Sequence, residues 1–287
     1  MRILRPIISV ITILFISLLP VTAYAETEEV NKIDLFLGDS TTSAIGVSSI
    51  QRWSKLFSDK DNAQEVNYAV GGSGWKDTKW VHDGRTYADQ YAKARYALGN
   101  NAQYVHRVFV VGFVNDIQSG TSVQDIKTKM KDLLTTIHAD LPKAQLIYIP
   151  EIAAPSPKNL SLLSKMLPVS EELINTAQGI SGVYVADDCI DWLRDTSDTW
   201  QSDQTHPNAK GHEIVAQKVE SLVAQIDSGS KKAGKIDNAE SATPTDSNNT
   251  SLNYKQITLI VFIVIVLVSI ILVLIISRKQ KSKHGRH

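Results

Sequence analysis

The chain has 287 residues, of which 43% are hydrophobic and 21% are charged, so it is long enough for one large domain or two small ones. Its formal net charge is zero, which gives no support for a nucleic-acid partner, because such a partner needs a basic face. A single cysteine, Cys189, excludes a disulfide within the chain.

The first 25 residues have the pattern of an export signal. Arg2 and Arg5 precede an apolar run at residues 7–19, and Ala23-Tyr24-Ala25 forms a small-x-small cleavage site. We expect cleavage before Glu26. A retained membrane anchor is the alternative, which the shortness of the apolar run disfavours.

A second apolar run lies near the C-terminus. Residues 257–276 are 20 uncharged residues, about 30 Å of helix, which is enough to cross a bilayer. The basic stretch that follows, "SRKQKSKHGRH", belongs on the cytoplasmic side, and it disfavours the alternative of a buried core helix. The expected order is signal peptide 1–25, extracellular domain 26–227, flexible stalk 228–253, transmembrane helix 254–277 and cytoplasmic tail 278–287. This describes a single-pass protein of the cell membrane.

Between the two ends, β-rich runs alternate with stretches of helical spacing. The predicted strands are 33–38, 65–70, 104–112, 144–150 and 182–187, and the predicted helices are 49–57, 87–98, 123–138, 169–178 and 207–226. Pro207 is expected at the first position of the last helix. This alternation predicts an α/β domain whose parallel sheet is covered by helices on both faces.

Polar and glycine residues follow three of the predicted strands. Ser40 comes after the turn residue Gly38 in "GDSTT", a glycine cluster follows the second strand in "NYAVGGSGW", and Asn115 follows the third in "VVGFVNDI". The last helix begins in "DQTHPNAKGHEIVAQKV", which contains Asp203 and His206. Each of these alone is more often a turn, cap or surface residue. Their order is informative because the carboxyl ends of parallel strands meet at one edge of a sheet.

These residue types together fit acyl transfer by a serine nucleophile. A serine hydroxyl needs a base to take its proton, and the base needs a third group to fix its tautomer. Asp203 and His206, separated by two residues, can meet within one turn. Negative charge on a carbonyl oxygen then needs donors, which the backbone N–H groups of Ser40 and Gly72 and the Asn115 amide can supply.

At these positions the chain resembles the SGNH hydrolases, also called GDSL-type lipases and esterases. The resemblance covers residues 33–226 and rests on "GDST", on Gly72 in "GGSG", on Asn115 in "VND" and on "DQTH". It implies a three-layer α/β/α, flavodoxin-like fold with a five-stranded parallel sheet and no metal or other cofactor. It also implies Ser40 as nucleophile, His206 as base and Asp203 as its orienting acid. The oxyanion hole would consist of Ser40, Gly72 and Asn115.

One position departs from the family pattern. Phe113 stands two residues before Asn115, where the family has glycine, while Gly112 precedes it. This change is expected to narrow the pocket or to shift Asn115. Gly71 and Gly72 remain interchangeable as oxyanion donors.

Several other residues have less specific patterns. Trp75 and Trp80 are candidates for lining a sugar or acyl site, or for packing at the core or rim. Asp116 is expected to hold a turn and Cys189 to be packed. The histidines 82, 106, 138 and 212 are read as solvated or packed, because they lack partners at metal-ligand spacing.

The sequence therefore predicts a membrane-anchored, extracellular serine esterase acting on small acyl esters, with acetyl groups on glycans as the leading substrate. The same residues also serve an acyltransferase that uses a sugar hydroxyl in place of water. A surface binding module without catalysis is the third hypothesis, which the intact serine, histidine, aspartate and asparagine disfavour.

Overall fold

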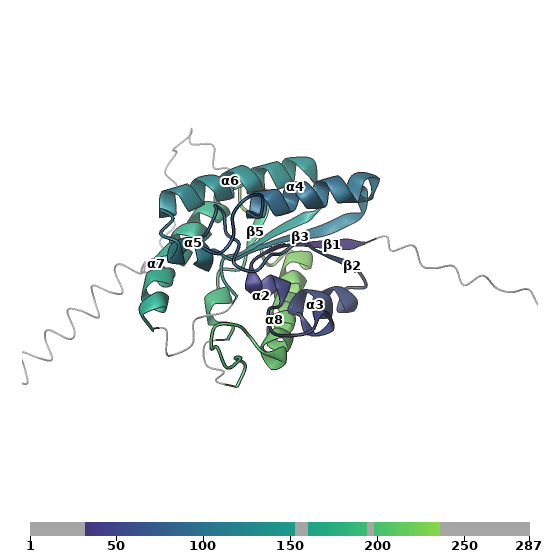
Figure 1. Cartoon of the computed structure of the whole chain (residues 1–287). Helices are drawn as coiled ribbons and strands as arrows, with labels where there is room; N and C mark the ends of the chain where they lie inside the picture. The colour runs from purple at the N-terminus through teal and green to yellow at the C-terminus, as the bar shows by residue number, and fades with distance from the viewer. Residues whose placement is uncertain (1–31, 153–159, 194–197, 236–287) are drawn as a thin grey trace, which may run out of the picture. The chain divides into compact units, whose positions relative to one another are not determined.

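Five parallel strands form the centre of the domain, in the order β2-β1-β3-β4-β5 (Figure 1). The computed structural model describes residues 32–152, 160–193 and 198–235. The strands are β1 (Ile33–Gly38), β2 (Gln64–Asn67), β3 (Val105–Val111), β4 (Gln145–Ile149) and β5 (Val183–Val185). All five predicted strands are present, and the all-parallel sheet confirms the predicted fold class.

Helices cover both faces of this sheet, which makes the three-layer arrangement visible in Figure 1. The α-helices are α2 (Ser40–Ser43), α3 (Trp53–Lys60), α4 (Tyr87–Leu98), α5 (Val114–Gln118), α6 (Val123–Asp140), α7 (Leu160–Gln178) and α8 (Ala209–Asp227). Short 3-10 helices lie at Ser49–Gln51, Gly99–Tyr104 and Cys189–Asp191. Helices α4, α6 and α7 pack into the core of one face, and α3 and α8 pack into that of the other.

Strands β1, β3 and β4 are mostly apolar without alternation because both of their faces are buried, whereas the edge strand β2 is polar and partly exposed. In β1, Leu35 and Leu37 contribute to the core beneath α4, α6 and α7, whereas Phe36 points to the core beneath α3 and α8. Phe36 stacks on Phe109 of β3 with ring centroids 4.9 Å apart. Successive side chains of a strand point to opposite faces, so β1, β3 and β4 contribute to both cores.

The strand order places a crevice at the end of β1. The chain passes from β1 to β2 on one side and then returns to form β3 on the other side of β1. The chain that leaves β1 therefore runs toward β2, and the chain that leaves β3 runs the opposite way, toward β4. In open α/β sheets, ligands bind at such a switch point. The segments after β1 and β3 carry Ser40 and Asn115.

Three predicted helix boundaries were wrong. Arg52 has an extended backbone (φ −71°, ψ 144°) that separates the 3-10 turn from α3, which begins at Trp53. Helix α7 begins at Leu160 and contains Pro168. Helix α8 begins at Ala209, where the side chain of Asn208 accepts a hydrogen bond from the Gly211 N–H and caps the helix.

The described part of the domain extends beyond α8. The Gly234 N–H donates to the Val183 carbonyl over 2.8 Å, and the Gly182 N–H donates to the Gly234 carbonyl over 3.1 Å. The first residues of the segment interpreted as a stalk therefore lie against β5.

Within the described ranges, no helix combines the length and the apolar character needed to cross a membrane. The predicted signal peptide at 1–25 and the predicted membrane span at 254–277 lie outside those ranges.

Candidate active site

Ser40 is the first residue of α2, directly after β1. The Asp39 side chain caps this short helix by accepting a hydrogen bond from the Thr41 N–H over 3.0 Å. Gly38 is fixed by Gln90, which accepts from the Gly38 N–H over 2.8 Å and donates to the Gly38 carbonyl over 2.9 Å. The end of β1 is therefore held rigidly, and the cap leaves the Ser40 N–H available to a ligand.

Asp203 and His206 form a hydrogen-bonded pair in the loop before α8. Asp203 Oδ2 lies 2.7 Å from His206 Nδ1. The other carboxylate oxygen accepts from the backbone N–H groups of Thr205 over 2.9 Å and of His206 over 3.1 Å. Burial raises the pKa of Asp203, but its hydrogen bonds from His206 and Thr205 lower it more, so the net shift is downward. The acid holds both the ring and the backbone of His206.

The loop that carries this pair is tied to neighbouring segments, which corrects the expected role of Pro207. Pro207 is paired with Trp200 in an isolated β-bridge before the helix, not in the first turn of α8. Gln201 donates a backbone hydrogen bond to the His206 carbonyl over 2.9 Å, and its side chain donates to the Ile45 carbonyl over 2.7 Å. The second bond joins the histidine loop to the segment after α2.

The glycine loop after β2 lies beside Ser40. Gly72 has a φ of +82°, and a Cβ built on it would lie 2.9 Å from the Trp80 Cβ. A Cβ built on Gly71 would lie 2.5 Å from the Ile45 Cδ1 and 3.8 Å from the Ser40 Cβ. Both glycines line the same cavity as Ser40, so the alternative between them as oxyanion donors stays open.

Asn115 lies in α5, the short helix that follows β3. Its side chain is buried, with 7% of its surface exposed, and Nδ2 donates to the Ser73 carbonyl over 2.9 Å. The Asp39 Oδ2 atom is 3.5 Å from the same nitrogen. Asn115 is therefore positioned by the glycine loop and by the residue before Ser40.

Asp116 holds the glycine loop against α5. Its carboxylate accepts from the backbone N–H groups of Trp75 over 3.0 Å and Lys76 over 3.1 Å. Burial raises the pKa of Asp116 to about 6. The carboxylate thus has the turn-holding contacts expected from the sequence.

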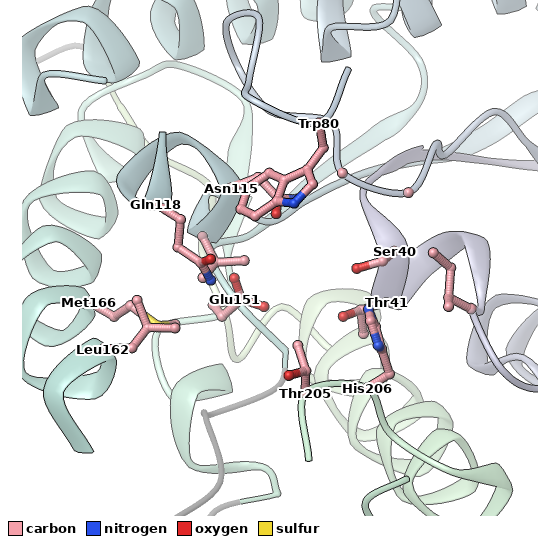
Figure 2. Close-up of a pocket in the computed structure, with 14 residues that line it drawn as sticks. Ser40, Thr41, Trp80, Asn115, Gln118, Glu151, Leu162, Met166, Thr205 and His206 are labelled. Atoms are coloured by element: carbon pink, nitrogen blue, oxygen red, sulfur yellow. The ribbon is translucent and has the colours of Figure 1, made fainter. Parts of the chain in front are cut away.

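A cavity of about 530 Å³ brings these segments together (Figure 2). Ser40, Gly72, Asn115 and His206 line it, and Asp203 is hydrogen-bonded to His206 from outside the lining. The other lining residues are Thr41, Ile45, Gly71, Trp80, Val114, Gln118, Glu151, Leu162, Met166 and Thr205. Figure 2 shows Ser40, Thr41 and His206 on one side, facing Gln118, Leu162 and Met166 on the other. The structure therefore brings all five predicted site residues to one place.

Asp39 is a second carboxylate next to this site, and it is buried. Burial raises the pKa of Asp39 to about 6, although the Thr41 N–H and the charge of His206 lower it. No role for Asp39, Glu151 or Gln118 was predicted from the sequence. Glu151 carries the same signal as Ser40 and Asn115, because it follows the end of a strand, β4.

Phe113, which stands where the family has glycine, is not part of the cavity wall. Phe113 is fully buried in the core with α4 and α6 and is absent from the residues that line the cavity. Gly112 takes the strained position instead, with a φ of +104°. A Cβ there would lie 2.7 Å from Asp39 Oδ2 and 2.8 Å from the Tyr87 hydroxyl. Phe113 therefore does not itself narrow the pocket, and the alternative, a shift of Asn115, stays a prediction.

The two tryptophans differ in role. Trp75 is 2% exposed, and its Nε1 donates to the Gly112 carbonyl over 3.1 Å. Trp80 is 46% exposed and lines the cavity. Cys189 is buried, and burial raises the pKa of its thiol, so it is packed as expected.

One group of possible metal ligands lies among the described residues, at the opposite edge of the sheet. Asp34, Asp61 and His106 offer atoms within 4.8 Å of one another. Lys32 pairs with Asp61 over 2.8 Å, and Arg107 also pairs with Asp61. These two cations already neutralise Asp61, and Arg107 lies 4.0 Å from Asp34, which identifies the group as an ion-pair network.

Comparison with known proteins agrees with this geometry. The sequence pattern of the GDSL-like Lipase/Acylhydrolase family matches residues 36–214, more than half of the chain. A comparison with curated protein sequences found no match.

Solved structures share the fold. A family two carbohydrate esterase from Clostridium thermocellum, in complex with cellohexaose, gives a TM-score of 0.55 at 18% identity, covering 69% of this chain and 65% of that chain. The psychrotrophic esterase EstA from Pseudoalteromonas sp. gives 0.47 at 17% identity, covering 69% and 99%. The structure of TesA gives 0.48 at 16% identity, covering 67% and 98%. Because the family pattern matches more than half of the chain, the chain belongs to the GDSL-like lipase/acylhydrolase family and is an ester hydrolase.

Proposed function

We propose that the protein hydrolyses small acyl esters, with acetyl groups on glycans as the leading substrate, through a Ser40–His206–Asp203 triad. The observation that carries this proposal is that Ser40 and His206 line one cavity while Asp203 holds His206 Nδ1 at 2.7 Å. A proton on Nδ1 leaves Nε2 free to accept the serine proton.

The reaction has two halves. As Ser40 Oγ attacks the ester carbonyl, its proton passes to His206 Nε2, and the N–H groups of Ser40, Gly72 and Asn115 stabilise the oxyanion. The oxyanion collapses, the C–O bond to the alcohol breaks, and His206 gives its proton to the departing alkoxide. Water then loses a proton to His206 and attacks the acyl-serine, which releases the carboxylic acid and restores the Ser40 hydroxyl.

The glycan part of the proposal has two supports. Trp80 is 46% exposed and lines the cavity, and aromatic rings offer a large apolar surface with specific geometry. The carbohydrate esterase that shares the fold is described in complex with cellohexaose.

The direct test is Ser40→Ala, assayed with p-nitrophenyl acetate. We expect kcat to fall by at least about a thousandfold, because the covalent route is lost. Ser49→Ala removes an exposed hydroxyl and serves as the control, with activity near that of the wild type. Unchanged activity in Ser40→Ala would show that another group is the nucleophile.

We further propose that the domain is exported and held at the cell membrane by residues 254–277, because their 20-residue uncharged run is followed by a basic tail. We expect the full chain to remain in the membrane fraction after an alkaline wash, and a chain ending at Lys235 to be released. Equal release of the two chains would contradict the anchor.

A further inference from the structure

A second, smaller cavity adjoins the candidate active site, and its volume is about 300 Å³. Its lining residues are Lys79, Ile117, Gln118, Leu162 and Lys165. Gln118 and Leu162 also line the main cavity, where Figure 2 shows them across from Ser40. A substrate whose acyl group lies at Ser40 therefore extends across the main cavity toward the smaller one with its alcohol portion.

Two lysines give the smaller cavity a positive charge. Lys79 comes from the loop between β2 and α4, Lys165 comes from α7, and both residues are exposed. Within the described ranges, no ion pair joins either of them to a carboxylate. Lys76 of the same loop, in contrast, pairs with Asp125 over 3.2 Å. The loop and the helix thus bring two charges without a counter-charge to one cavity.

The position of Lys79 is fixed relative to the main cavity. Its Nζ atom lies 4.3 Å from the centre of the Trp80 ring, and its backbone N–H donates to Ser119 Oγ over 3.0 Å. A cation above the face of an aromatic ring is attracted by the ring. Because Trp80 lines the main cavity, the ammonium group of Lys79 lies beside both cavities.

An anionic group is the ligand chemistry that fits two lysine side chains. Each ammonium group has three hydrogen-bond donors and no acceptor, and its hydrogen bonds to a carboxylate or a phosphate are stronger than those to a neutral hydroxyl. A membrane surface fits less well, because recognition of anionic lipids by exposed cations takes about four to eight basic residues together.

We propose that Lys79 and Lys165 form a subsite for an acidic group, a carboxylate or a phosphate, on the sugar that carries the ester. The enzyme then prefers acylated acidic sugars to acylated neutral sugars. This inference rests on the proposed function at Ser40. It assigns the two lysines to substrate recognition, with no part in the reaction steps.

The test compares kcat/KM at low salt for mono-acetylated glucose, mono-acetylated glucuronate and mono-acetylated glucose 6-phosphate. We expect the wild type to favour at least one acidic sugar over the neutral one by about fivefold, because each exposed ion pair contributes a few-fold. The acid with the larger preference identifies the group. The preference should nearly vanish at about 1 M salt, where the screening length falls to about 3 Å.

Substitutions at Lys165 test the subsite directly. Lys165→Met keeps an apolar stem but removes the charge, so the preference should fall about two- to fivefold. Lys165→Glu places a like charge beside the anion and should lower the preference further. Lys79→Met should also lower it. The matched control is Lys218→Met, which changes an exposed lysine of α8 on the other face of the sheet and should keep the wild-type preference.

The outcomes separate this inference from the proposed function. If Ser40→Ala abolishes activity but the wild type prefers neither acidic sugar, or Lys165→Glu keeps the wild-type preference, the acidic subsite is wrong and the esterase assignment stands. If Ser40→Ala stays active, the proposed function itself fails. If p-nitrophenyl acetate is hydrolysed but none of the three sugars is, the glycan part of that proposal fails, and the subsite fails with it.

Discussion

At the scale of single residues, Asp203 acts on His206 mainly by fixing its geometry. The Asp203 side chain is 46% exposed and that of His206 is 19% exposed, so water screens much of their attraction. The Asp203 carboxylate nevertheless accepts three hydrogen bonds, from the Thr205 and His206 backbone N–H groups and from the imidazole, and these fix the ring and its tautomer. Orientation of the base is the contribution that a partly solvated acid can make.

Gly112 provides a test of how the buried carboxylate supports the site. In Gly112→Ala the new Cβ would meet Asp39 and Tyr87 at a φ of +104°. We expect a loss of about 2 kcal/mol or more in unfolding free energy and a lower kcat, because Asp39 contacts the Asn115 amide.

The matched control for this substitution is Gly120→Ala. Gly120 has a φ of +79°, and a Cβ there would meet nothing within 4 Å. We expect only the backbone cost of about 1 kcal/mol and a kcat close to that of the wild type. Equal effects of the two substitutions in urea unfolding and in the esterase assay would contradict the role given to Gly112.

Among the elements, the strands and long helices were predictable, because the spacing of their apolar residues indicates which faces are buried. The run of β1 is apolar on both faces, and α6 repeats apolar residues at helical spacing. The grouping of the polar residues at the strand ends was also predictable, because the carboxyl ends of parallel strands meet at one edge of a sheet.

Short elements and long-range contacts were not predictable in this way. Helices α2 and α5 have four and five residues, too few to show a periodic pattern. The loop before α8 is fixed by the bridge between Trp200 and Pro207 and by the bond from Gln201 to Ile45. The bond to Ile45 joins segments 156 residues apart, so local sequence gives no signal for it. The bridge that places Pro207 is a single pairing without a periodic pattern, and Pro207 was placed wrongly.

Across the whole domain, the candidate active site and a buried ion-pair network lie at opposite edges of the sheet. Arg107 is buried at the edge opposite the cavity, where it pairs with Asp61 and, over 3.0 Å, with Asp227. Burial raises the pKa of Asp34 to about 7, with Asp61 adding to the effect and Arg107 and Lys32 opposing it.

This network predicts a pH dependence of stability. The folded state holds the Asp34 proton more tightly than the unfolded chain, where the pKa is near 3.8. On its account wild-type stability falls as pH rises from about 4 to about 7. Asp34→Asn lacks this loss. We expect its unfolding free energy to gain on that of the wild type across this window, by on the order of 1–3 kcal/mol.

Chemical unfolding at about pH 4.5 and about pH 8, near the two ends of the window in which Asp34 titrates, measures this difference. Asp59→Asn changes an exposed carboxylate and should show no comparable trend. A difference between Asp34→Asn and wild type that stays constant or shrinks with rising pH would contradict the assignment.

The proposed reaction requires Ser40 as the nucleophile and His206 as its base. The most direct measurement is labelling of the folded protein with an alkyl phosphonate ester, followed by mass mapping of the modified peptide. We predict one phosphonyl group on the peptide that contains Ser40, and labelling at least about a hundredfold slower in a folded His206→Ala variant. A label on a different serine, or an equal rate in His206→Ala, would contradict the account.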